Sequence, residues 1–170
     1  MPAPTPHYVI CQIKFRQSGL HLNFRMVDAA VFAAKINSLP PGPVIPSVPD
    51  VEHSWSTNVG LFNPDDNRRV LAFDRITHLL FISDDENWWF YPPGFDTKEA
   101  AMMSNFSGIE RINNGTGLRV TFAPSANPPQ AGLNIPYNVY MRTVVWQSGA
   151  KNGHATIIID PVFETGTVRK

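Results

Sequence analysis

The sequence predicts an all-β protein: an antiparallel β-sandwich, of the jelly-roll or immunoglobulin-like kind, with one or two short helices. Three observations predict this fold class. Short segments of alternating or apolar residues recur along the chain, and turn residues separate them about every ten residues. No long amphipathic helix lies between them, as an α/β fold would require. The length of 170 residues suits a single domain spanning residues 1–170.

The N-terminal sequence predicts a short leader followed by a β-hairpin. Residues 1–6 (MPAPTP) predict a flexible leader without the basic and apolar regions of a signal peptide. Residues 7–15 and 20–26 alternate apolar with polar side chains, which is typical of half-buried strands. Residues 18–19 supply the turn between them. Cys11 lies in the first of these strands, and we expect a buried, reduced thiol there.

A short helix and a proline-rich connector follow the hairpin. Residues 27–36 are rich in alanine, with Val27, Val31 and Ala34 at helical spacing, and Asp28 can act as the N-cap. Residues 39–49 contain five prolines in eleven positions, which predicts an extended connector. We expect it to cross the surface of the domain; the alternative is a docking site for proline-recognition modules.

Most of the remaining elements are predicted to be strands. Residues 96–99 (DTKE) have the spacing of a capping box and predict a short helix over 96–103. The sequence NNGTG at 113–117 is typical of a hairpin turn, and residues 124–136 predict a loop. Strands are predicted at residues 69–73, 76–82, 88–91, 108–112, 118–122, 137–146 and 155–159, with an edge strand at 162–168.

Charge and cysteine content exclude several classes of protein. Fourteen basic residues balance fourteen acidic ones, so the chain lacks the basic excess of a nucleic-acid-binding protein. One cysteine excludes an internal disulfide and a cysteine-based zinc site. No apolar stretch is long enough to cross a membrane. We therefore expect a cytoplasmic protein, and zero net charge favours a homo-oligomer because it removes repulsion between copies.

No motif predicts a cofactor or a metal. The chain lacks phosphate-binding glycine loops and a nucleophile elbow. No two histidines have metal-ligand spacing, so a metal site would require residues from several strands. The histidines are His7, His21, His53, His78 and His154.

Residues 83–95 (SDDENWWFYPPGF) have the most unusual composition of the chain. Three acids and an amide precede four aromatic residues, and a Pro-Pro-Gly turn at 92–94 follows. Carbohydrate sites combine these types, because flat rings cover the apolar face of a sugar while carboxylates and amides bind its hydroxyls. The acids lack the spacing of a calcium-binding EF-hand loop. The alternative is that at least two aromatics are core and the others contact a protein. The candidate ligand-binding residues are Asp84, Asp85, Glu86, Asn87, Trp88, Trp89 and Tyr91.

Three functional hypotheses follow. The first is a non-catalytic β-sandwich protein that acts through binding or self-association. The second is a module that binds a carbohydrate or another small ligand through residues 84–91. The third is a hydrolase or metal-dependent enzyme whose site is assembled across strands, although no spacing singles out a catalytic pair among the candidate acids. These acids are Asp74, Asp84, Glu86, Glu110 and Asp160.

Overall fold

The computed structural model describes residues 2, 4–16, 19–42, 52–56, 75–124, 134–147, 150–159 and 162–164. The predicted strand at 69–73, most of the connector at 39–49, Asp74 and Asp160 lie outside the described residues, as do the side chains of His53 and His154.

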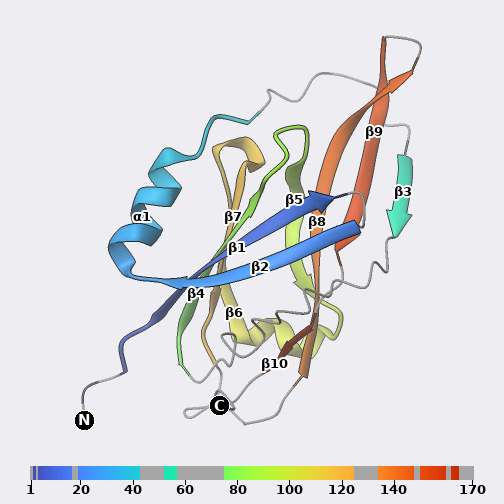
Figure 1. The fold of residues 1–170 in the computed structure, drawn as a ribbon. Helices are drawn as coiled ribbons and strands as arrows, with labels where there is room; N and C mark the ends of the chain where they lie inside the picture. The colour runs from blue at the N-terminus through green and yellow to red at the C-terminus, as the bar shows by residue number, and fades with distance from the viewer. Residues whose placement is uncertain are drawn as a thin grey trace.

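The described residues form two sheets, and the prediction of an all-β sandwich with few, short helices is confirmed. The first sheet has the strand order β2 (Gly19–Val27), β1 (His7–Arg16), β4 (Thr77–Ser83), β7 (Gly117–Phe122) and β6 (Phe106–Ile112) (Figure 1). The second has the order β10 (Val162–Glu164), β8 (Asn134–Gln147), β9 (Ala150–Ile159) and β3 (Glu52–Ser56), and β5 (Trp89–Thr97) also pairs with β8. Most neighbours are antiparallel, but β1 with β4 and β3 with β9 are parallel.

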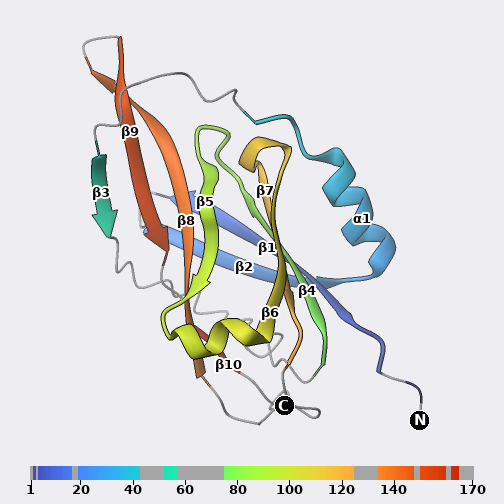
Figure 2. The ribbon, with the colours of Figure 1, turned by 180° about the vertical axis from the view of Figure 1, so that it is seen from behind.

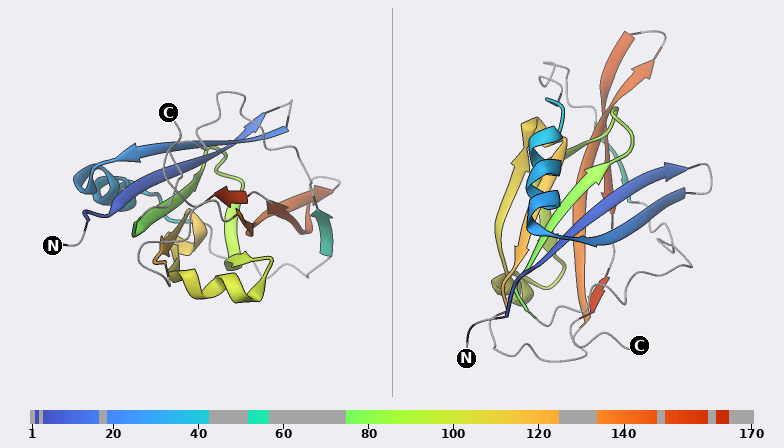
Figure 3. Two further views of the ribbon diagram at one scale, coloured as in Figure 1. Left: turned by 90° about the horizontal axis from the view of Figure 1, so that it is seen from below. Right: turned by 60° about the vertical axis from the view of Figure 1, so that its left-hand side comes forward.

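The main core lies between the two sheets, which form separate layers (Figure 3). The predicted face of β1 points inward, with Val9, Cys11 and Ile13 all buried. Burial raises the pKa of the Cys11 thiol well above its usual value, so this thiol stays protonated and unreactive. Across the core, β8 contributes Ile135, Tyr137, Val139 and Met141 in strict alternation.

Helix α1 (Ala29–Ser38) covers the outer face of the first sheet (Figure 1). It begins as predicted at Asp28, whose Oδ1 accepts a hydrogen bond of 2.8 Å from the Val31 N–H. Phe32 and Ile36 face the sheet. Of the three residues noted for their helical spacing, Val31 and Ala34 are exposed, and Val27 ends β2 and packs half-buried against this core. This packing buries β1 and β4 on both faces, which suits a parallel pair. The buried residues of this second core are Ile10, Phe32, Leu39, Leu80 and Ile82.

The predicted C-terminal end of the strand at 88–91 is wrong. Strand β5 does not stop at a Pro-Pro-Gly turn but continues to Thr97, between β8 and the β6–β7 hairpin (Figure 2). Pairing passes from Phe90–Met141 directly to Phe95–Val139, so residues 91–94 form a large bulge opposite one residue of β8. Prolines supply no N–H to a ladder, and a bulge tolerates them because its residues are left out of the ladder.

The predicted capping box is also wrong, although a short helix follows it. The segment η2 (Ala100–Asn105) is a 3-10 helix with no side-chain cap at Glu99. Asp96 lies in β5, where its carboxylate accepts hydrogen bonds of 2.8 Å from Asn138 Nδ2 and from the Tyr140 hydroxyl. The cross-strand partners therefore occupy the carboxylate that would have capped the helix.

The other predicted elements that fall on described residues are present with shifted ends. The 113–117 turn joins β6 to β7 through the short 3-10 segment η3 (Asn113–Gly115). Strand β8 begins within the predicted 124–136 loop, and β10 covers the first three residues of the predicted edge strand, whose other residues lie outside the described part of the chain. Among the described residues, no helix is long and apolar enough to cross a membrane.

Candidate functional site

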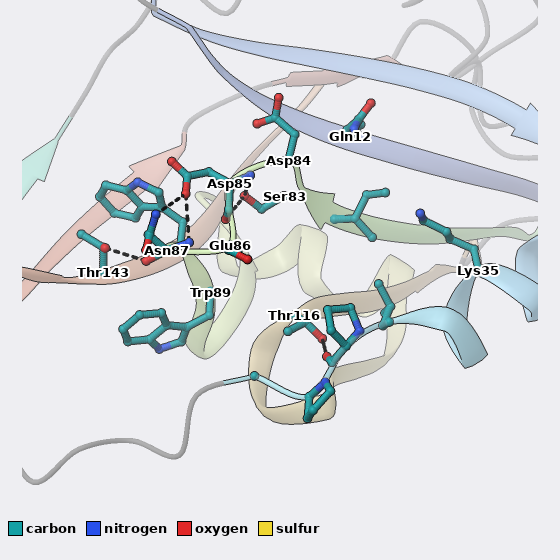
Figure 4. A pocket seen from close by; sticks show the side chains of 16 residues that line it. Gln12, Lys35, Ser83, Asp84, Asp85, Glu86, Asn87, Trp89, Thr116 and Thr143 are labelled. Carbon is teal, nitrogen blue, oxygen red and sulfur yellow. Dashed lines mark hydrogen bonds between the residues drawn. The ribbon is translucent and has the colours of Figure 1, made fainter.

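An open pocket of about 780 Å³ lies beside the C-terminal end of α1 (Figure 4). Its volume falls within the range of about 300 to 1,000 Å³ typical of small-molecule sites. The loop from β4 to β5 forms one side, and α1 with the segment Leu39–Gly42 forms the other. Six of the seven candidate ligand-binding residues line it: Asp84, Asp85, Glu86, Asn87, Trp88 and Trp89.

Internal hydrogen bonds hold the acidic loop in place. Asp85 Oδ1 accepts bonds from both the N–H and the Nδ2 of Asn87, at 2.9 and 3.0 Å. Ser83 Oγ donates to the Asp85 carbonyl at 2.9 Å and accepts from its N–H at 3.1 Å. On β8, the Thr143 hydroxyl donates to the Asn87 carbonyl at 2.5 Å. This loop is therefore shaped without a ligand, as a preformed site requires.

The first acid of the loop is tied to β1. Asp84 Oδ1 accepts a 3.0 Å hydrogen bond from the Phe15 N–H, and the Asp84 N–H donates to the Ile13 carbonyl at 3.0 Å. Glu86 differs, because its exposed side chain makes no hydrogen bond or ion pair with the described part of the chain. Among the three acids, Glu86 therefore has its full acceptor capacity available to a ligand.

The two tryptophans of the pocket differ in accessibility. Trp88 is half-buried and stacks on Phe15, with ring centroids 5.3 Å apart and an interplanar angle of 10°. Trp89 lines the pocket but is only 4% exposed. Trp89 and Phe90 are thus the two core aromatics expected of this segment, and Trp88 offers the more accessible ring.

The opposite wall is attached to the β6–β7 turn. Asn113 Nδ2 donates to the Leu39 carbonyl at 2.8 Å, and its own carbonyl accepts from the Gly42 N–H at 2.7 Å. The Thr116 hydroxyl donates to the Pro40 carbonyl at 2.8 Å. The first residues of the proline-rich connector are therefore docked against the domain, and their prolines help to line the pocket.

Tyr91 does not line the pocket. It lies in the β5 bulge, where the Arg142 guanidinium carbon is 3.4 Å from the centroid of its ring. Arg142 is buried, at 8% exposed, and Tyr91 is half-buried.

The sequence did not single out the pocket residues that come from other elements. Lys35 lies in the last turn of α1 and reaches toward the pocket from the side opposite the acidic loop (Figure 4). Gln12 on β1 and Thr116 after the β6–β7 turn also line it. Each is an ordinary residue for its element, and no local pattern marks it.

The candidate histidine and metal sites receive no geometric support in the described part of the chain. His78 stacks on Tyr8 at 5.1 Å, and its Nδ1 lies 3.0 Å from Thr121 Oγ1, outside the pocket lining. Glu110 pairs with Arg119 at 3.1 Å. No group of three or more His, Cys, Asp or Glu side chains is arranged to hold a metal ion there.

The fold and the site define a β-sandwich protein with a preformed polar and aromatic pocket beside its helix. A scan against models of protein families finds no match for the chain, and a search of curated proteins finds no significant relative.

Proposed function

We propose that this protein is a non-catalytic binding protein whose ligand is a saccharide or a similar polyhydroxylated small molecule held in the pocket. One observation carries the proposal: six of the seven candidate residues line one pocket of about 780 Å³. Saccharide sites need an aromatic surface next to several hydrogen-bonding groups, and this pocket has both.

The hydrogen bonds of the acids favour binding over catalysis. A glycosidase needs two carboxyl groups that act on the scissile bond. Here Asp84 accepts from the Phe15 N–H, and Asp85 accepts from Asn87, so both contribute to the shape of the loop. Glu86 is the one acid of the three without such a bond in the described part of the chain. This arrangement supports a fixed recognition surface.

A titration monitored by tryptophan fluorescence tests the proposal. We expect a panel of mono- and disaccharides to contain a ligand that changes the emission, and the Trp88→Ala variant to weaken its binding at least tenfold. Tyr91→Phe is the matched control, because Tyr91 lies outside the pocket. The absence of saturable binding to any saccharide, or equal affinity for wild type and Trp88→Ala, contradicts the proposal.

Self-association is a second candidate, supported by the edge of the first sheet. Strand β2 spans nine residues and ends the order of its sheet, with Met26 43% exposed near its C-terminal end. An edge strand of this length can pair with the same strand of another copy. Light scattering at high micromolar concentration should then give a dimer mass that Asn23→Pro reduces to a monomer. A monomeric wild type contradicts this candidate and leaves the pocket proposal unaffected.

A further inference from the structure

Charged groups of opposite sign lie on the two sides of the pocket. Glu86 belongs to the β4–β5 loop, and Lys35 belongs to the last turn of α1 (Figure 4). On the basis of the proposed function, we infer that the pocket selects an amino sugar, with the sugar's ammonium group at Glu86 and a hydroxyl oxygen at Lys35.

The hydrogen-bonding capacities of these two side chains are complementary. A carboxylate only accepts hydrogen bonds, and an ammonium group only donates them. A ligand that spans the pocket must therefore present a donor to Glu86 and an acceptor to Lys35. A sugar hydroxyl satisfies either side, but an ammonium group at Glu86 adds the Coulomb attraction between opposite charges to the hydrogen bond.

The availability of Glu86 sets it apart from its neighbours. Asp84 and Asp85 already accept backbone N–H groups, whereas Glu86 is exposed and unbonded within the described residues. A ligand ammonium group can therefore approach it without breaking a bond of the loop. Trp88 beside it adds an aromatic surface that attracts a cation.

The overall charge of the pocket lining also favours a positively charged ligand. Three carboxylates and one ammonium group line the pocket, so its formal charge is −2. A concave site of one sign concentrates ligands of the opposite sign. The negative charge of the pocket disfavours uronic acids, which carry a carboxylate, and it does not attract neutral sugars.

Two disaccharides that differ only at nitrogen test the inference. Chitobiose built from glucosamine carries free amines, and its di-N-acetylated form carries neutral amides on the same ring skeleton. We would titrate both into the wild type at about pH 6, below the ordinary pKa of such an amine. The expected result is about tenfold tighter binding of the free amine, with a preference that decreases as salt is added.

Three variants test which residue causes the preference for the free amine. Glu86→Gln should lower the affinity for the free amine about tenfold and leave the acetylated sugar unchanged, which removes the preference. Lys35→Met should weaken both sugars and keep the preference. Glu110→Gln is the matched control, since Glu110 pairs with Arg119 outside the pocket, and it should change neither affinity.

The outcomes separate this inference from the function on which it depends. Binding of neither disaccharide, nor of any other saccharide, overturns the proposed function. Equal affinity of the wild type for the two disaccharides overturns only the amino-sugar inference. An unchanged preference in Glu86→Gln, or an equal loss in Glu110→Gln, also overturns it.

Discussion

Gly115 is the residue with the tightest surroundings in the β6–β7 turn. Its φ is +98°, and a Cβ there would lie 2.4 Å from the Phe90 carbonyl oxygen of β5. The Arg111 Nε donates to the same oxygen at 3.0 Å. The backbones of the turn and of β5 are therefore in close contact, next to Trp89 and Thr116, which line the pocket.

Replacement of this glycine should be costly. We expect Gly115→Ala to lower the free energy of unfolding by about 3 kcal/mol, because the methyl group combines a clash with an unfavourable φ. Gly108→Ala is the control: its φ is also positive, at +59°, but its Cβ would make only ordinary contacts with the Thr121 side chain, 3.5 Å from Oγ1 and 3.9 Å from Cβ. That change should cost about 1 kcal/mol. Urea unfolding measures both, and equal losses would show that the close approach to Phe90 is not the cause.

His78 should make stability depend on pH. Burial and the nearby positive charge of Arg119 lower the pKa of its imidazole from the ordinary 6.5. The unfolded chain therefore binds a proton more readily than the folded one, so this contribution to stability is lost as the pH falls below 6.5 and through the folded pKa. Unfolding by urea at successive pH values should show a decline that is smaller in His78→Gln than in the wild type. A decline of the same size in His78→Gln would contradict this assignment.

Single residues were predictable where one local rule governs them. Asp28 caps α1 because a carboxylate before an alanine-rich segment bonds the free N–H groups of the first turn. The segment from Asp84 to Trp89 was singled out by its composition of acids and aromatics, and these six residues line one pocket in the structure. Tyr91 belongs to the same run but lies under Arg142, a partner 51 positions away in the sequence (91 to 142) that no local pattern reveals.

At the scale of elements, Asn113 connects the β6–β7 turn to the segment after α1. Its φ is +49°, and its side chain donates to the Leu39 carbonyl. Asn114 has a similar φ of +59° but no hydrogen bond from its side chain within the described residues. The two asparagines form a matched pair in which glycine can replace either without backbone strain.

We expect Asn113→Gly to lower the free energy of unfolding by about 1 kcal/mol more than Asn114→Gly, because it alone removes a side-chain hydrogen bond. Hydrogen exchange offers a local check. The Gly42 N–H, which donates to the Asn113 carbonyl, should exchange faster in Asn113→Gly than in Asn114→Gly. Identical stability and exchange in the two variants would show that this bond does not hold the pocket wall.

Strand β5 and the helix after it show the limit of local prediction for elements. Pro92-Pro93-Gly94 is a strong turn sequence, yet the pairing with β8 resumes at Phe95 because Phe95 reaches the main core. The DTKE spacing likewise favours a cap, but Asn138 and Tyr140 bind the aspartate first. In both places, packing between distant strands outweighs the local preference.

At the scale of the whole molecule, alternation and turn residues were enough to predict a sandwich. They do not determine which strands become neighbours. The parallel pairing of β1 with β4 places Gln12 beside Ile82 and brings α1 and the β4–β5 loop to the same region. The pocket therefore combines segments near positions 12, 35, 85, 116 and 143, which explains why only its contiguous acidic and aromatic part was predictable.

The position of a bound saccharide tests most directly whether the pocket is the binding site. Backbone amide shifts, followed by NMR during titration with the tightest-binding sugar of the panel, give that position residue by residue. We expect the largest changes in amide chemical shift at residues 83–89, and smaller changes at Lys35 and Thr116 on the other walls of the pocket. Changes centred on Tyr91 and Tyr140, or no changes with any saccharide, would contradict it.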